Sequence, residues 1–477
     1  QKGKRIRISP SCDLAGHLTK RETVKQILER HFDTNMLVPF LKPQKERNAA
    51  IDRGYEITST FYARLAGIYP DLEAGWRYRL FGTYQNLVVV AYIYYVSAYL
   101  VANVVALQYM DVELIGSTFC FGGYTYTYAL IAALFYVKRS KIDRLLEMIG
   151  NELYIYQRPF TPKELEIKKE EIKKAKHFGR YSFYIPCTVA LTQMAFVPAI
   201  HGFKGEYSSI VNGSATINKY TPLPVWTPVD ATSGISFFIL YWCQLGPGFV
   251  EFLIFHGSCT FFVGTICVLV SDLRILQSSL EDIQKRSYHL YRMKGGKGEE
   301  NKGLLDDSLY QQCMTACLKE NVQHHIKIVE FHNLFQDIVG YAIFFILTGA
   351  AVTISTPPFT ILQIMEKGET HKFYSAGIVM LGHTFLSVYL LSRYCKFGQN
   401  FENESRKVLD AFYGTPWYKA NMTFRKLLIV AMLNSQKTLQ INAAVVGVSA
   451  SAATFMDVIK SSYSLLNFLA SSNGKSN

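Results

Sequence analysis

Hydrophobic residues gather in long runs along this chain, and polar residues gather between the runs. Five runs of about 20 residues or more carry almost no charge, at positions 84–110, 114–137, 181–203, 339–365 and 374–395. About 20 apolar residues in a helix cross the ~30 Å hydrocarbon core of a bilayer. A helix on the surface of a soluble domain would carry a polar face along such a run. The pattern therefore predicts a membrane-spanning helix at each place.

Two longer apolar tracts each allow more than one interpretation. Residues 232–272 can hold two spans, or one span followed by a buried helix, and a polar stretch at 434–437 interrupts the tract 427–470. We interpret the first tract as a span at 232–252 and a helix below the membrane at 253–272. The second is interpreted as a helix outside the membrane followed by a last span at 439–470.

The basic residues support this interpretation because they then lie almost entirely on one side. With seven spans and the N-terminus inside, 44 of the 50 Lys and Arg residues fall in inner segments. The outer loops hold only Lys204, Lys219, Lys367 and Lys372. Such an excess of basic residues marks the cytoplasmic side. The expected fold is all-α, a polytopic membrane protein with seven transmembrane helices, a cytoplasmic N-terminus and an extracellular C-terminus, the opposite orientation to a G-protein-coupled receptor.

The inner segments carry helical patterns of their own and are expected to form a cytoplasmic helical anchor base. Their apolar faces favour oligomerisation, because one chain would not cover all of them. The expected segments are cytoplasmic N-terminal helices at 1–80, spans 1–4 with a ligand pocket at 81–252, a cytoplasmic extension and loop at 253–338, spans 5–6 at 339–395, cytoplasmic helices at 396–438, a pore-lining span 7 at 439–470 and an extracellular tail at 471–477.

Composition narrows the function. Charged residues are 18% of the chain, below the roughly 25% of soluble domains. The net charge of +13 is split among the inner segments without a nucleic-acid-binding motif, so anionic lipid explains it better. The nine cysteines contain no CxxC pair, and HExxH, GxSxG and P-loop motifs are missing from the sequence, which predicts no enzyme, metal or cofactor. The sequon at Asn212 falls in an expected outer loop and predicts glycosylation.

Short motifs follow one another in the last third of the chain. The stretch YCKFG at 394–398 is followed by Ser405, by Trp417-Tyr418 and by VIKSSYS at 458–464. Their order and spacing resemble the insect odorant receptors. The ending SYSLLNFL lacks the glutamine found in the coreceptor and in gustatory receptors, so it is more similar to a ligand-tuning odorant receptor. The chain is longer than most tuning receptors, and it approaches the length of the coreceptor.

The resemblance implies an odorant-gated, non-selective cation channel subunit that binds a small volatile, apolar odorant. Four subunits would surround a pore lined by the seventh span, in a heterotetramer with the coreceptor or in a homotetramer. The implied location is the plasma membrane of a sensory neuron dendrite. A gustatory-type ligand-gated channel and a metabotropic seven-helix receptor are the alternatives.

The seventh span is rich in small and polar residues. Asp457 and Lys460 lie three apart on one helical face and can pair, and ionisable residues in a span face protein or water. Tight packing through Gly447 and Ser451 is the alternative explanation. By position, the resemblance makes Leu466 the constriction. The expected pore and gate residues are Asp457, Lys460, Ser461, Ser464, Leu466 and Asn467.

The resemblance places the ligand pocket in the outer half of spans 2, 3, 4 and 6, where volatile ligands call for apolar and aromatic side chains. Tyr124 and Tyr128 share a helical face and are the first candidates. Lipid-facing or packing aromatics are the alternative, and His383 can equally be a packed histidine. No carboxylate is expected here, which disfavours a cationic ligand. Glu251 and His256 are expected near the inner interface, and a buried functional pair is the alternative. The candidates are Phe121, Tyr124, Tyr128, Thr192, Phe196, Phe238, Tyr241, Trp242, Ile378 and His383.

Overall fold

The computed structural model is helical throughout most of its described length. It describes residues 44–58, 76–109, 112–193, 209–210, 216–218, 221, 223–228, 234–298, 304–366, 368 and 377–473. The chain divides into a unit that ends at Ala49 and a unit from Ala50 to Asn477, and the second unit contains the features discussed below.

Each expected span falls on a helix, which confirms the all-α fold class. Five of the described helices are long and apolar enough to cross a membrane, by length and composition. The count of seven spans and the side on which each terminus lies stay predictions. The helices at the seven expected spans are α5 (Trp76–Tyr109), α6 (Val112–Val137), α8 (Pro162–Leu191), α10 (Gly234–Glu281), α12 (Ser308–Glu366), α14 (Ile378–Tyr413) and α16 (Ala452–Asn473).

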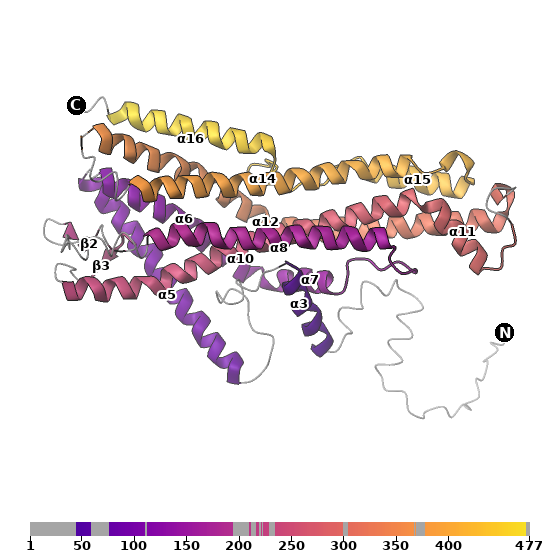
Figure 1. Ribbon diagram of the computed structural model, residues 1–477, viewed down its shortest axis with the longest axis horizontal. Coiled ribbons are helices and arrows are strands. Elements are labelled where there is room, and N and C mark those ends of the chain that lie inside the picture. Colours follow the sequence, from indigo (N-terminus) through magenta and orange to yellow (C-terminus); the bar gives the residue numbers. More distant parts are fainter. Residues whose placement is uncertain are drawn as a thin grey trace, which may run out of the picture. The chain divides into compact units, whose positions relative to one another are not determined.

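Several of these helices run without a break from an expected span into an expected inner segment. Helix α10 contains both the span expected at 232–252 and the helix expected at 253–272, and α12 joins an inner helix to span 5. Helix α8 begins with Pro162 behind a capping box, in which the Thr161 hydroxyl accepts a hydrogen bond from the Glu164 backbone N–H. Figure 1 shows α8, α10, α12 and α14 lying side by side, in contact along their lengths.

The expected helical base is present as a densely packed cluster around the second half of α10. Nearly every α10 residue from Leu253 to Leu280 is buried. Around it pack α11 (Ile283–Met293), the first half of α12, the end of α14 and α15 (Met422–Ser435). Helix α7 (Arg139–Gly150) packs closely against residues 50–58 of α3 (Gln44–Thr58), since a Cβ at Gly150 would lie 1.7 Å from the Ala50 carbonyl oxygen. The remaining helical turns are η3 (Leu304–Asp306) and η5 (Trp417–Lys419).

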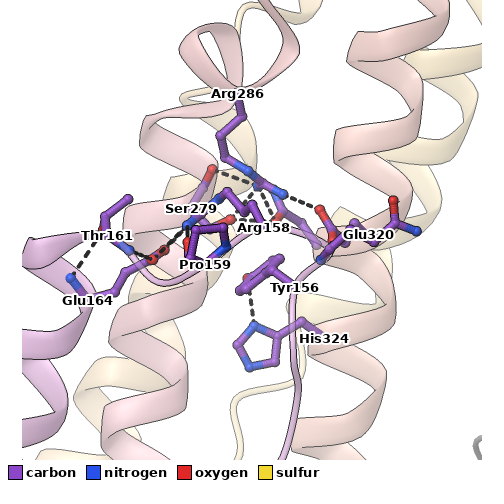
Figure 2. A network of polar contacts seen from close by, with 11 residues as sticks. Tyr156, Arg158, Pro159, Thr161, Glu164, Ser279, Arg286, Glu320 and His324 are labelled. Carbon is purple, nitrogen blue, oxygen red and sulfur yellow. Dashed lines mark hydrogen bonds and ion pairs between the residues drawn. The ribbon is translucent and has the colours of Figure 1, made fainter. Parts of the chain in front are cut away.

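A polar network joins the helices of the base (Figure 2). Arg286 on α11 forms an ion pair with Glu320 and donates to Asn321 over 2.8 Å, both on α12. The Tyr156 hydroxyl lies 2.7 Å from His324 Nδ1, and the Arg286 guanidinium lies over the Tyr156 ring. Arg286, Asn321 and His324 are buried, so these charged and polar groups meet each other in place of water.

A small antiparallel sheet between α8 and α10 was not expected from the sequence. Its strands β1 (Ser209–Ile210), β2 (Thr216–Asn218) and β3 (Trp226–Thr227) pair in the order β1-β2-β3. Leu223 and Val225 pack against Tyr95 and Tyr99 of α5. The Leu223 backbone N–H also donates to Gln244 Oε1 over 2.9 Å, which ties this segment to α10.

The last helix begins later than expected, at Ala452 and not at Leu439. Residues 439–451 form a tight turn in which Asn442 and Ser449 make an isolated β-bridge. Gln336 on α12 holds the turn by accepting from the Asn442 backbone N–H and donating to the Asn442 carbonyl, over 2.9 and 2.7 Å. These bonds compete with helical ones, so Gly447 and Ser451 lie ahead of the helix and cannot form the helix-packing pair considered above.

Candidate ligand cavity and pore helix

A cavity of about 90 Å³ lies between α5, α6, α8, α10 and α14. Its volume is enough for on the order of six water-sized groups. Seven of its 16 lining residues carry aromatic rings, and Leu223 from the segment before β3 contributes to the wall. The lining residues are Tyr99, Phe121, Tyr124, Thr125, Tyr128, Pro186, Val189, Ala190, Gln193, Leu223, Gly248, Glu251, Phe252, Phe255, His383 and Leu386.

Four of the expected pocket residues meet at this cavity: Phe121, Tyr124 and Tyr128 on α6, and His383 on α14. The Tyr124 hydroxyl donates to the His383 carbonyl oxygen over 3.0 Å, and the Phe121 and His383 rings pack edge to face with centroids 4.8 Å apart. The His383 Nε2 lies 2.7 Å from Gln193 Oε1 on α8. His383 therefore lines the cavity and is also a packed, hydrogen-bonded histidine, so the two interpretations hold together.

The other expected pocket residues that the structure describes are not among those that line the cavity. Phe238, Trp242 and Ile378 have exposed side chains. Tyr241 packs its ring edge to face on Trp242, and Thr192 donates to the Thr188 carbonyl of its own helix. Phe196 lies outside the described residues, as does the sequon residue Asn212. A role for these residues in ligand binding or glycosylation stays a prediction.

The cavity contains a carboxyl group, which corrects the expectation that no carboxylate faces this region. Glu251 contributes to the wall, and Thr125 Oγ1 lies 3.1 and 3.0 Å from its two oxygens. The cavity lies further along α10 than expected, at residues 248–255, and Leu223 contributes to its wall. The sequence held a signal, since Glu251 is the single carboxylate between Asp230 and Asp272.

The last helix leaves a polar face uncovered. Asp457, Lys460, Ser464 and Asn467 are exposed and recur every three or four residues along α16. Ser461 is exposed on the same side, whereas Leu466 is partly covered. Among the described ion pairs, none joins Asp457 to Lys460, although their spacing would allow one.

The opposite face of α16 packs against α12 and against α14, of which α14 also lines the cavity. Phe455, Val458 and Ile459 contact a cluster that contains Ile354 of α12 and Leu391 of α14. The hydroxyl groups of Tyr124, Ser387 and Thr353 form a chain from α6 through α14 to α12, with 3.0 Å between Ser387 and Thr353. Ile354 follows Thr353, and Leu391 lies one turn beyond Ser387. Helix α14 thus contributes to the cavity wall and contacts α16, and the hydroxyl chain connects the wall to α12, which also contacts α16.

The fold is that of a polytopic helical membrane protein, and its helices enclose a cavity with apolar and aromatic lining. A family model described as 7tm Odorant receptor matches residues 111–463. The chain belongs to this odorant receptor family, whose members are ligand-gated cation channels and not enzymes. The resemblance seen in the motifs is confirmed.

Individual relatives agree with the family. The chain is 21% identical to odorant receptor 67c of Drosophila melanogaster over 350 residues, which are 72% of this chain and 77% of that protein. It is 25% identical to Drosophila odorant receptor 85f over 149 residues, 31% and 36% of the two chains.

Solved structures show the same fold. The olfactory receptor OR5 from Machilis hrabei matches with a TM-score of 0.63 at 12% identity, over 87% of this chain and 96% of that chain. Its complex with eugenol matches with a TM-score of 0.64 at 13% identity, over 88% and 97%.

Proposed function

We propose that this chain is a ligand-tuning subunit of an odorant-gated, non-selective cation channel. A small volatile binds in the cavity between α5, α6, α8, α10 and α14, and its binding opens a pore lined by α16. The observation that carries the proposal is the pairing of an aromatic cavity with a helix whose polar face a single chain leaves uncovered. Eugenol, the ligand in the related OR5 complex, is a compact aromatic molecule, which supports a ligand of that size here.

The uncovered face of α16 supports assembly into a tetramer. Asp457 and Lys460 would be costly in lipid, so they would face a water-filled path or another subunit. In the tetramer, four copies of α16 surround the pore and Leu466 forms its constriction, which closes by excluding water. Three coreceptor-type or identical subunits supply the remaining walls. The N-terminus is cytoplasmic, the C-terminus is extracellular and Asn212 carries the sugar.

Coupling between the cavity and the pore runs through α12 and α14 in this proposal. A ligand that moves Tyr124 or His383 changes the hydroxyl chain to Ser387 and Thr353. The cluster around Ile354 and Leu391 lies next to that chain and holds α16. Both sites therefore bias the same two helices, which is the physical requirement for coupling.

Whole-cell currents test the proposal. The chain is expressed in the plasma membrane with and without the coreceptor, and small aromatic volatiles, including eugenol, are applied. We expect an evoked cation current. We also expect Leu466→Ala to raise the resting current, since a smaller ring of side chains no longer excludes water, whereas Leu465→Ala is the neighbouring control. A silent channel that is present at the cell surface would contradict the receptor function, and an unchanged resting current would contradict the gate.

A further inference from the structure

The cavity contains one carboxyl group, and the structure describes no cationic side chain that pairs with it. Glu251 lies on α10 within the expected fourth span, and its carboxyl group faces the aromatic wall. A carboxyl group within a span is costly unless a partner compensates it. Among the described residues, Thr125 is the one hydrogen-bond partner of Glu251, and no Lys, Arg or His lies within ion-pair distance of it.

The groups around Glu251 are those that bind a cation. The rings of Tyr99, Tyr124, Tyr128, Phe252 and Phe255 line the same cavity. Aromatic faces attract a positive charge, by about 0.5–1 kcal/mol at exposed sites and about 2 kcal/mol or more where water is excluded. An ammonium group in this cavity would be attracted both by the aromatic faces and by the carboxylate.

A second polar group in the wall, the Tyr99 hydroxyl, has no hydrogen-bond partner in the described part of the chain. The Tyr99 side chain is fully buried, lines the cavity, and its hydroxyl makes no hydrogen bond to the described residues. A buried polar group left unpaired costs about 1–3 kcal/mol. An ammonium group has several N–H donors, so it can satisfy Glu251 and the Tyr99 oxygen together.

We infer that the cavity selects a small volatile amine with an apolar body, bound as an ammonium–carboxylate pair with Glu251. The inference rests on the proposed function and names its ligand class. The carboxyl group orients the ligand through Thr125, which holds it on the α6 side of the cavity, and the rings enclose the apolar part. A neutral ligand of the same shape fills the cavity but leaves the carboxyl group uncompensated.

The test uses three ligands of matched shape on the chain expressed with the coreceptor: 2-phenylethylamine, 2-phenylethanol and propylbenzene. We expect a half-maximal concentration for the amine at least tenfold below that for propylbenzene, with the alcohol between them. Equal responses to the three ligands, or a preference for the alcohol or the hydrocarbon, would overturn the inference while leaving the receptor function in place. Silence to all three, with the subunit at the surface, would overturn the proposed function itself.

Variants test whether the Glu251 carboxyl group causes the preference for the amine. Glu251→Gln keeps the size and the contact with Thr125, so the amine should need at least tenfold more ligand while propylbenzene changes less than twofold. Glu366→Gln, an exposed carboxyl group at the end of α12, is the matched control and should change neither response. Thr125→Val, which leaves the carboxyl group but removes its partner, should weaken the amine response by a few-fold. An amine response that Glu251→Gln and Thr125→Val both leave unchanged would contradict the assignment.

Discussion

The base and the part of the helix bundle that contains the cavity treat their charged groups differently. In the base, Arg286 forms an ion pair with Glu320, donates to Asn321 and lies over the Tyr156 ring (Figure 2). At the cavity, Glu251 has one hydrogen-bond partner among the described residues, the neutral Thr125, and the Tyr99 hydroxyl has none. The base thus pairs opposite charges within the protein, whereas no described side chain of opposite charge pairs with Glu251.

The helices show the same contrast in their apolar surface. The most apolar window of α10 is 94% buried inside the protein, whereas that of α5 is 33% buried. Leu87, Val90 and Ile93 of α5 are exposed, as expected for side chains that face lipid. A long apolar run can therefore serve a protein core or a lipid boundary, and the two cannot be distinguished by hydropathy alone.

The largest effect is expected where the base network is broken. Arg286→Met leaves Glu320 and Asn321 without their buried partner, which destabilises by about 3–5 kcal/mol. The thermal unfolding temperature of the purified channel should fall clearly, and both ligand response and assembly should be lost with it. Lys285→Met is the control, because the Lys285 side chain is 80% exposed and its ion pair is with Asp282, the residue just before its own helix. If the two variants unfolded at similar temperatures, the buried ion pair of Arg286 would contribute no more to stability than the exposed pair of Lys285.

The next effect concerns the contact between α14 and the turn that precedes α16. A Cβ at Gly398 would lie 2.2 Å from the Ala450 carbonyl oxygen, so Gly398→Ala must displace the turn that precedes α16. We expect the evoked current to fall more than tenfold while surface labelling shows the subunit in place. Gly246→Ala makes the same change on α10, where nothing lies within 4 Å of the new atom, and should leave the current unaltered. If Gly398→Ala gave a normal current, the proposal that this turn sets the position of α16 in the channel would be wrong.

A smaller effect is expected in the cavity wall. Tyr124→Phe removes the hydroxyl that donates to the His383 carbonyl, a change of about 1 kcal/mol. Concentration–response curves should shift by about fivefold, with little change in unfolding temperature. Tyr184→Phe, on an exposed side chain of α8, is the matched control. If Tyr124→Phe lowered the unfolding temperature strongly, the Tyr124 hydroxyl would have a structural role, like the polar groups of the base.

The smallest effect is a pH dependence that belongs to the base. Burial alone would raise the pKa of Glu164, but the hydrogen bonds from Arg158, at 2.7 and 2.8 Å, and from the Thr161 backbone lower it on balance from its usual 4.5. Because the folded pKa is depressed, this carboxylate stabilises the fold above pH 4.5, and the contribution is lost as the pH falls through the folded pKa.

Unfolding temperatures between pH 6 and pH 4 measure this contribution. Glu164→Gln should lower the unfolding temperature at pH 6 and flatten its fall toward acid. Glu281→Gln is the control, because Glu281 is 62% exposed and pairs with an exposed Lys163. Parallel curves for Glu164→Gln and the wild type would contradict the assignment.

The candidate site was predictable only in part. Tyr124 and Tyr128 share one face of α6, and both line the cavity, because helical spacing is a local property of the sequence. Phe238 and Trp242 had equal aromatic character and lie outside it. Glu251 was assigned to the inner interface, although its isolation in an apolar stretch was visible in the sequence. Composition says which residues can line a site, and packing decides which of them do.

The sequence by itself determined that the chain is helical, where its long apolar runs lie and to which family it belongs. The length of an apolar run and the order of short motifs depend only on the sequence, so they can be recognised without knowledge of contacts between distant segments. Only the tertiary structure decided the depth of the cavity, the meeting of Glu251 with an aromatic wall, and the start of α16 at Ala452. Each of these depends on segments far apart in sequence, such as Leu223 against α10 and Gln336 against Asn442, whose contacts form only when the helices pack.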